Sequence, residues 1–133
     1  MKLRRVALIL FYNDKKEILL QDRTGISKFG EEWGQFGGSI EEGETPEQAV
    51  IRETKEELNF NLKEHKYIGE VNNQLREDLF VERYVFIAPL KNHLSSFTQL
   101  EGTHMQLFSI DEARKLKMVP GDEMVIEALE KAI

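Results

Sequence analysis

Residues 38–57 read GSIEEGETPEQAVIRETKEE, and this stretch ends in three glutamates, Glu53, Glu56 and Glu57, at helical spacing. Positions three and four apart on a helix are surface neighbours, so these side chains point the same way and repel one another. Each like-charged pair costs about 0.2–0.5 kcal/mol in an isolated helix. The apolar residues 49–50 precede the glutamates on nearly the same side and begin a core stripe, which the acids then continue.

Acids that continue a core stripe indicate a function for the negative charge. Hard divalent cations take oxygen ligands, and Mg²⁺ is usually held by a few carboxylates together with water and substrate phosphates. The acidic helix face is therefore a candidate magnesium platform. The alternative is a solvated acidic face without a ligand, which would leave the neighbouring glycines and the well-capped helix start unexplained.

The ends of the helix are marked by local signals. Thr45 is suited to the N-cap and Pro46 to the first helical position, and Gln48 completes a capping box with Thr45. Asn59 can end the helix because asparagine tolerates the left-handed conformation used there. The sequence thus predicts a helix over residues 46–58, preceded by a glycine-containing loop that, with the helix, forms one wall of a pocket.

The segment resembles the signature of the Nudix hydrolases, G-x5-E-x7-R-E-U-x-E-E-x-G-U, in which U is a bulky aliphatic residue. The charged and glycine positions that match are Gly38, Glu44, Arg52, Glu53, Glu56 and Glu57. Two positions differ, because Thr54 stands where an aliphatic residue is usual and Asn59 where glycine is usual. Thr54 lies on the packing side of the helix, so it bears on stability more than on chemistry.

The resemblance implies a Mg²⁺-dependent hydrolase, in which Mn²⁺ can substitute, acting on a nucleoside diphosphate linked to another moiety. Charge develops on phosphoryl oxygens during such a displacement, so divalent ions and fixed cations stabilise the transition state. The residues expected to hold the metal are Glu53, Glu56, Glu57, the carbonyls of Gly37 and Gly38, and Glu101. Arg52 is expected to orient Glu53 by a charge-assisted hydrogen bond rather than to touch the substrate.

The general base is open between two glutamates. Glu101 lies in a loop where similar nucleotide-cleaning Nudix enzymes carry a glutamate that acts as metal ligand or base. Such a base must reach the attacking water directly or through one intermediary. The alternative for Glu101 is an ordinary exposed loop residue, and Glu53 is then the base.

The residues expected to bind substrate are Arg23, Asp122, Phe36 and Glu44. Similar enzymes place a phosphate-binding cation where Arg23 stands, although a surface salt bridge would also explain this arginine. Asp122 corresponds to a position that hydrogen-bonds the base in such relatives, and it is also suited to be the N-cap of the last helix. The ring of Phe36 could stack on a purine or belong to the core. No histidine metal site is expected.

Composition predicts a single domain over residues 1–133. The chain is 41% hydrophobic and 32% charged, as is usual for a soluble globular protein. Its net charge of −6 argues against general binding to nucleic acid or to anionic membranes. Cysteine is absent, which fits a reducing cytoplasm, and no run could span a membrane. The expected partner is a small nucleotide, and the chain could be a monomer or a homodimer.

Hydrophobic patterning predicts an α/β fold, and the resemblance implies an α/β/α sandwich with a mixed central sheet. The expected strands cover residues 5–12, 17–22, 67–75, 79–90 and 105–109. Besides the signature helix, the expected helices cover residues 111–116 and 122–132. Residues 24–34 and 91–103 are expected to be loops.

Three functions from different classes are compatible with this sequence. The first is a nucleoside or deoxynucleoside triphosphate pyrophosphohydrolase of the housecleaning kind, including one that acts on an oxidised purine. The second is a hydrolase of a nucleotide sugar, ADP-ribose or a dinucleoside polyphosphate. The third is a non-catalytic nucleotide-sensing module, against which the complete Arg-Glu-x-x-Glu-Glu argues, because a pure binder has no need for metal-binding acids.

Overall fold

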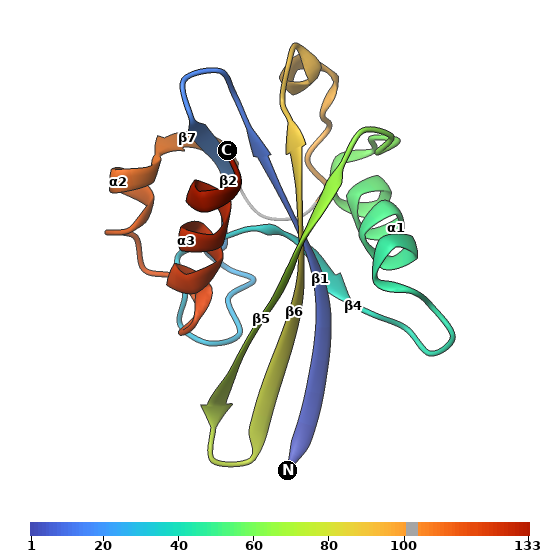
Figure 1. The fold of residues 1–133 in the computed structure, drawn as a ribbon, viewed down its shortest axis with the longest axis vertical. Helices are drawn as coiled ribbons and strands as arrows, with labels where there is room; N and C mark the ends of the chain where they lie inside the picture. Colours follow the sequence, from blue (N-terminus) through green and yellow to red (C-terminus); the bar gives the residue numbers. More distant parts are fainter. Residues whose placement is uncertain (101–103) are drawn as a thin grey trace.

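The computed structural model describes residues 1–100 and 104–133, which form a mixed β-sheet with helices on both faces (Figure 1). The strands are β1 (Lys2–Tyr12), β2 (Glu17–Asp22), β3 (Trp33–Gly34), β4 (Phe36–Ser39), β5 (Lys66–Arg76), β6 (Leu79–Pro89) and β7 (Met105–Ser109). The helices are α1 (Pro46–Leu58), the 3₁₀ turn η1 (His93–Ser96), α2 (Ile110–Ala113) and α3 (Asp122–Ala132). The predicted α/β/α sandwich is confirmed.

Strand β1 lies at the centre of the sheet. It pairs in parallel with β6 along its whole length, from Lys2 opposite Leu79 to Tyr12 opposite Pro89. On its other side it pairs antiparallel with β4 and, at its end, with β2. The strand order is β3-β2-β1-β6-β5, with β4 beside β1 and β7 beside β2. The predicted hairpin of β1 with β2 and the predicted antiparallel pair of β5 with β6 are both confirmed.

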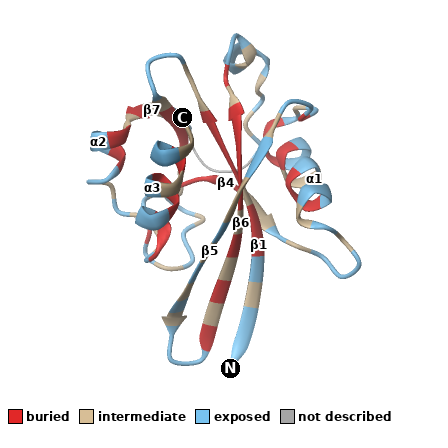
Figure 2. Ribbon diagram, viewed as in Figure 1, coloured by how far each residue is buried: buried red, intermediate tan, exposed pale blue. Residues whose placement is uncertain are grey.

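Each face of the sheet carries its own hydrophobic core, because successive side chains of a strand point to opposite faces. Ala7, Ile9 and Phe11 of β1 pack toward α1, whereas Leu10 packs toward α2 and α3. Buried residues follow the middle of β1 and β6, while the first residues of β1 are exposed (Figure 2). None of the helices in the described part of the chain is both long and apolar enough to cross a membrane.

Helix α1 begins and ends at the predicted residues. The Thr45 side chain accepts a hydrogen bond from the Gln48 backbone N–H, and the Gln48 side chain accepts one from the Thr45 backbone N–H. Asn59 adopts the left-handed conformation with φ of 51°. Thr54 is fully buried, and its hydroxyl donates to the Val50 carbonyl at 2.7 Å. The hydrogen bond satisfies the hydroxyl, which lets a threonine occupy the packing side of this helix.

Other boundaries differ from the sequence prediction. The segment with Gly37 and Gly38, predicted as a loop, is strand β4, in which Gly38 lies opposite Ala7 and Gly37 opposite Leu8. Glycine has low strand propensity, and here pairing with β1 overrides it. The predicted loop over residues 24–34 contains the short strand β3, and α2 ends three residues before the predicted end at residue 116.

Gly37 is a position that only glycine fits. Its φ is +134°, and a Cβ atom there would lie 2.1 Å from the Ala7 carbonyl oxygen. We predict that Gly37→Ala lowers the free energy of unfolding by about 2–5 kcal/mol. The alanine would be held in a strained backbone conformation, and its side chain would also clash with β1. Urea denaturation measures this change.

Gly43→Ala is the matched control, since Gly43 also has a positive φ, +80°, but no atom lies within 4 Å of the added Cβ. It should lose only about 1–2 kcal/mol. Equal losses in the two variants would show that β4 is not packed against β1 as closely as described.

Candidate active site

The acidic residues of α1 lie directly on the backbone of β4. Glu57 is buried, and its Oε1 accepts a hydrogen bond from the Gly37 N–H at 2.7 Å. A Cβ atom on Gly38 would lie 2.6 Å from the carboxyl carbon of Glu53. The absence of a side chain at Gly38 therefore lets the Glu53 carboxylate approach the strand. Gly37 and Gly38, the glycine that opens the signature, together bring two carboxylates against one strand.

Arg52 joins the acids to the preceding loop. Its Nε and Nη2 donate to the two carboxylate oxygens of Glu44 at 2.7 and 3.0 Å, and Nη2 also donates to the Ser39 carbonyl at 3.0 Å. Its Nη1 donates to Glu53 at 2.9 Å and to Glu56 at 3.3 Å. The expected hydrogen bond from Arg52 to Glu53 is present, and the role of Arg52 in orienting that carboxylate stays a prediction.

The charge of Arg52 changes the titration of Glu44. The side-chain hydrogen bond from Arg52 lowers the pKa of Glu44 to about 2, and the same bond raises the pKa of Arg52 above its ordinary value. Glu44 therefore stays ionised across the physiological range. In this structure Glu44 is a partner of Arg52 and does not line the pocket described below, and its contact with substrate stays a prediction.

The donors at this site suit Mg²⁺ chemically, because carboxylate and carbonyl oxygens are the hard ligands this ion prefers. Among residues 1–100 and 104–133, no group of three or more acidic, histidine or cysteine side chains is arranged so that it could hold a metal ion. Arg52 engages Glu53 and Glu56 in this arrangement. Glu53, Glu56, Glu57 and the Gly37 and Gly38 carbonyls remain the proposed ligands, and Glu101 lies outside the described residues.

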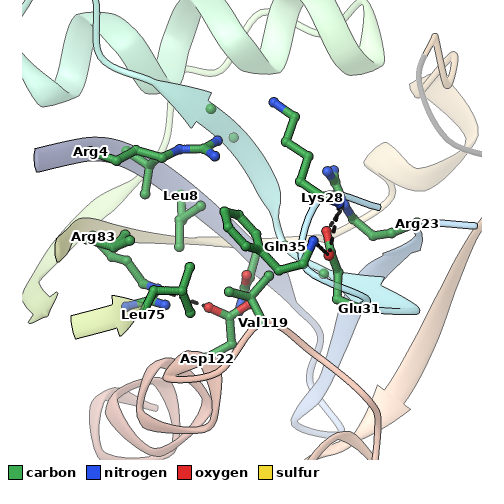
Figure 3. Close-up of a pocket in the computed structure, with 16 residues that line it drawn as sticks. Arg4, Leu8, Arg23, Lys28, Glu31, Gln35, Leu75, Arg83, Val119 and Asp122 are labelled. Atoms are coloured by element: carbon green, nitrogen blue, oxygen red, sulfur yellow. Dashed lines mark hydrogen bonds and ion pairs between the residues drawn. The ribbon is translucent and has the colours of Figure 1, made fainter. Parts of the chain in front are cut away.

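A pocket of about 100 Å³ opens on the α3 side of the sheet (Figure 3). Gly37 and Gly38 form part of its wall, so β4 separates the pocket from the acids of α1. The other lining residues are Arg4, Val6, Leu8, Arg23, Lys28, Phe29, Glu31, Gly34, Gln35, Leu75, Val81, Arg83, Val119 and Asp122. Whole ligand sites usually enclose about 300–1,000 Å³, so this pocket suits one part of a ligand, such as a heterocycle.

A buried ion pair forms one side of the pocket. Arg83 of β6 and Asp122 of α3 have side chains only 2% and 5% exposed, and Arg83 Nε donates to Asp122 Oδ1 at 3.0 Å. Arg83 also donates to Asn73 Oδ1 at 2.6 Å and to the Pro120 carbonyl at 2.9 Å. Sequence reasoning missed Arg83. The alternation of β6 was the available signal, because Arg83 stands in phase with the buried Val81 and Val85.

Asp122 differs from its predicted structural role. The N-cap of α3 is Gly121, with φ of 101°, and Asp122 is the first helical residue. Its carboxylate points to Arg83 and the pocket rather than to the helix N–H groups. Burial raises the pKa of Asp122 to about 6, and the neighbouring Arg83 charge opposes that rise.

A second carboxylate positions Arg23. Glu31 is buried; its Oε2 accepts from Arg23 Nε at 3.0 Å, and its Oε1 accepts from the backbone N–H of Phe29 and the hydroxyl of Ser27. Burial alone would raise the pKa of Glu31, but these hydrogen bonds lower it below its ordinary value. Arg23 lines the pocket, and its ion pair is with the buried Glu31 rather than a salt bridge on the surface. Its contact with phosphate stays a prediction.

The neighbouring residues Gln35 and Phe36 lie in different surroundings. Phe36 is fully buried in the core beneath α1, so the expectation that its ring stacks on a base is wrong for this structure. Gln35 is 6% exposed and lines the pocket. Within the described residues, its Nε2 is buried without a hydrogen-bond partner. A buried amide without a partner is costly, and a ligand in the pocket could satisfy it.

Comparison with known proteins gives the chain a family. The model of the NUDIX domain matches residues 2–129. The 8-oxo-dGTP diphosphatase of Escherichia coli K12 is 40% identical over 58 residues, which cover 44% of this chain and 45% of the relative. The dihydroneopterin triphosphate diphosphatase of the same strain is 35% identical over 57 residues, 43% of this chain and 36% of the relative. The match thus spans less than half the length of each curated relative.

The fold is shared with solved structures. The crystal structure of the MutT protein from Methanosarcina mazei Go1 superposes with a TM-score of 0.79 at 20% identity, covering 98% of this chain and 94% of that one. At this identity the likeness concerns the fold alone. The mixed sheet with helices on both faces is therefore the arrangement expected for this chain.

The raised pKa of Asp122 predicts the direction in which stability changes with pH. Its pKa rises from 3.8 to about 6 on folding, so between these values the native state binds more protons than the unfolded chain. The contribution of Asp122 to stability is complete below pH 3.8 and falls as the pH rises to about 6. The unfolding free energy of wild type minus that of Asp122→Asn should therefore fall by on the order of 2–3 kcal/mol over this window.

Urea denaturation at half-unit pH steps measures this difference, with Asp14→Asn in the exposed turn after β1 as the comparison variant. If the difference in unfolding free energy between wild type and Asp122→Asn does not change with pH, or increases with pH, the burial of an ionisable carboxyl at this position is contradicted.

Proposed function

The chain belongs to the NUDIX domain family, and from this premise we propose that it hydrolyses a nucleoside or deoxynucleoside triphosphate to the monophosphate and pyrophosphate. The observation that carries this proposal is the position of Gly37 and Gly38. They line the pocket on one side and contact the carboxylates of Glu53 and Glu57 on the other. A ligand with a heterocycle in the pocket would extend its phosphates past these glycines toward the acids.

The pocket supports a heterocycle with hydrogen-bonding edges. Asp122 offers a carboxylate acceptor, and Gln35 offers a buried amide that can donate or accept. Arg83 fixes Asp122 in place and stabilises its ionised form. An ionised Asp122 selects for a ring that presents an N–H group, as a purine amide or exocyclic amine does.

The names of the relatives support a triphosphate substrate. Both curated relatives are named as diphosphatases of triphosphates whose heterocycles carry several hydrogen-bonding groups. This favours a triphosphate, including that of an oxidised purine, over a nucleotide sugar, ADP-ribose or a dinucleoside polyphosphate. The proposed substrate is a small molecule in the cytoplasm, and the acidic net charge of −6 gives no support for nucleic-acid binding.

The chemistry divides between the proposed metal and the chain. Bound Mg²⁺, held by Glu53, Glu56, Glu57 and the β4 carbonyls, would supply positive charge against the phosphoryl oxygens. Glu53 or Glu101 accepts the proton of the attacking water as the new P–O bond forms and the bridging P–O bond to pyrophosphate breaks. Arg52 keeps Glu53 oriented for that role. Arg23, fixed by Glu31, contacts a distal phosphate.

A nucleotide panel tests the proposal. The protein is incubated with canonical and oxidised nucleoside triphosphates, nucleotide sugars, ADP-ribose and dinucleoside polyphosphates, with Mg²⁺ or with chelator. We expect pyrophosphate and monophosphate from triphosphates, only with the metal. Orthophosphate release, or turnover confined to the other substrates, would replace the proposed substrate class. Binding without turnover anywhere would indicate a non-catalytic module.

The acids provide a second test in the same assay. We predict that Glu53→Gln and Glu57→Gln each lower kcat by at least about a hundredfold, because a charge that acts in the transition state is lost. Glutamine keeps an oxygen that can accept from the Gly37 N–H, so circular dichroism and thermal unfolding should stay close to wild type. Glu47→Gln, on the exposed first turn of the same helix, is the control. Near wild-type turnover in both site variants would defeat the assignment.

A further inference from the structure

Arg4 is a partly buried cation that lacks a carboxylate partner in the described structure. It lies on β1 and lines the pocket. Its guanidinium is 6.0 Å from the centre of the Phe29 ring. Within residues 1–100 and 104–133 it forms no ion pair, whereas the neighbouring Arg23 and Arg83 each have one. A half-buried guanidinium without an ion-paired carboxylate requires an explanation.

The charges around the pocket do not balance. The cations that line it are Arg4, Arg23, Lys28 and Arg83, and the carboxylates are Glu31 and Asp122. Glu31 is paired with Arg23 and Asp122 with Arg83. Lys28, like Arg4, makes no ion pair with the described part of the chain. Two positive charges are thus left over in the pocket of a protein whose net charge is −6.

The local environment disfavours the charge on Arg4. Burial lowers the pKa of Arg4, and the nearby Arg23 lowers it further, while Glu31 opposes both. The Phe29 ring, whose centre also lies 5.8 Å from the Arg76 guanidinium, offers Arg4 an aromatic face but no negative charge. An anionic ligand would compensate this charge.

The two unpaired cations lie on the side of the pocket that faces the acids. In Figure 3 the ends of the Arg4 and Lys28 side chains lie on the side turned toward α1, the pale green helix at the top, and Asp122 lies on the opposite side. Gly37 and Gly38 line the same pocket and contact the α1 carboxylates. An anion held by Arg4 and Lys28 would therefore lie between the heterocycle pocket and the acidic helix.

We propose that Arg4 and Lys28 form an anion site at the mouth of the pocket that binds the phosphate chain of the substrate. This inference rests on the proposed function for the identity of the ligand. Arg4 can present two parallel N–H donors to a phosphate, and Lys28 adds a point charge from a different segment. Together they hold the phosphates in place, and they take no part in the proton transfer, which is assigned to Glu53 or Glu101.

Steady-state kinetics of Arg4→Gln and Lys28→Gln on the preferred triphosphate test the site. We expect KM to rise about tenfold for Arg4→Gln and less for Lys28→Gln, because charge-assisted hydrogen bonds to the bound substrate are lost. The kcat should stay within about threefold of wild type, since a contact shared by substrate and transition state affects KM alone. Arg5→Gln is the matched control, because Arg5 is the exposed neighbour on β1, ion-paired with Glu82 and outside the pocket lining.

Calorimetric binding of inorganic tripolyphosphate in chelator gives a readout without metal or turnover. Wild type and Arg5→Gln should bind it with equal affinity, and Arg4→Gln about tenfold more weakly. If Arg4→Gln fails to fold, the exposed Lys28→Gln carries the same test with Lys15→Gln as its control.

The outcomes separate the two proposals. If the protein hydrolyses nucleotides, but Arg4→Gln and Lys28→Gln change neither KM nor the affinity for tripolyphosphate, the anion site is overturned. The proposed function then still stands. Weakened tripolyphosphate binding in a protein that hydrolyses no nucleotide supports the anion site and overturns the proposed function.

Discussion

The contact between two glutamates of α1 and two glycines of β4 is the constraint on which the site depends. The Gly37 N–H donates to Glu57, and the absent side chain of Gly38 admits the Glu53 carboxylate. Both glycines are fixed by pairing with β1, the central strand. The other side of β4 borders the pocket. One short strand thus holds an acidic helix and a ligand pocket at a set separation, which a bulkier residue at either position would change.

Neighbouring acids on a helix repel one another, and Arg52 offsets that repulsion. It contacts Glu44, Glu53 and Glu56, and it ties the loop before α1 to the helix through Glu44 and the Ser39 carbonyl. Arginine–carboxylate pairs also offset charge in the pocket. Arg23 pairs with Glu31 and Arg83 with Asp122, and both pairs are partly or fully buried. Removing one member of such a pair leaves an uncompensated charge, which is strongly destabilising. Among the described residues, Arg4 and Lys28 are the cations of the pocket lining that have no ion pair of this kind.

The features that could be predicted from the sequence are those that depend on interactions between residues close together in the chain. The caps and bounds of α1 depend on residues within one turn of each other, so Thr45, Gln48 and Asn59 were sufficient. Strand β4 was missed because glycines carry no side-chain pattern and its pairing with β1 is tertiary. Arg83 was missed because its partner Asp122 lies 39 residues away, and Phe36 was misplaced because sequence does not show which face of β4 meets the core. Glu101 stays a prediction.

Binding of Mn²⁺ to the protein without substrate, followed by titration calorimetry or by the paramagnetic signal of the free ion, tests the central claim most directly. We expect saturable Mn²⁺ binding that Mg²⁺ displaces, weakened at least about tenfold in Glu57→Gln, because a carboxylate ligand becomes a neutral amide. Glu47→Gln should bind as wild type does. Equal Mn²⁺ affinity in wild type and Glu57→Gln, or no saturable binding at all, would contradict the claim that the α1 acids hold a divalent ion beside β4.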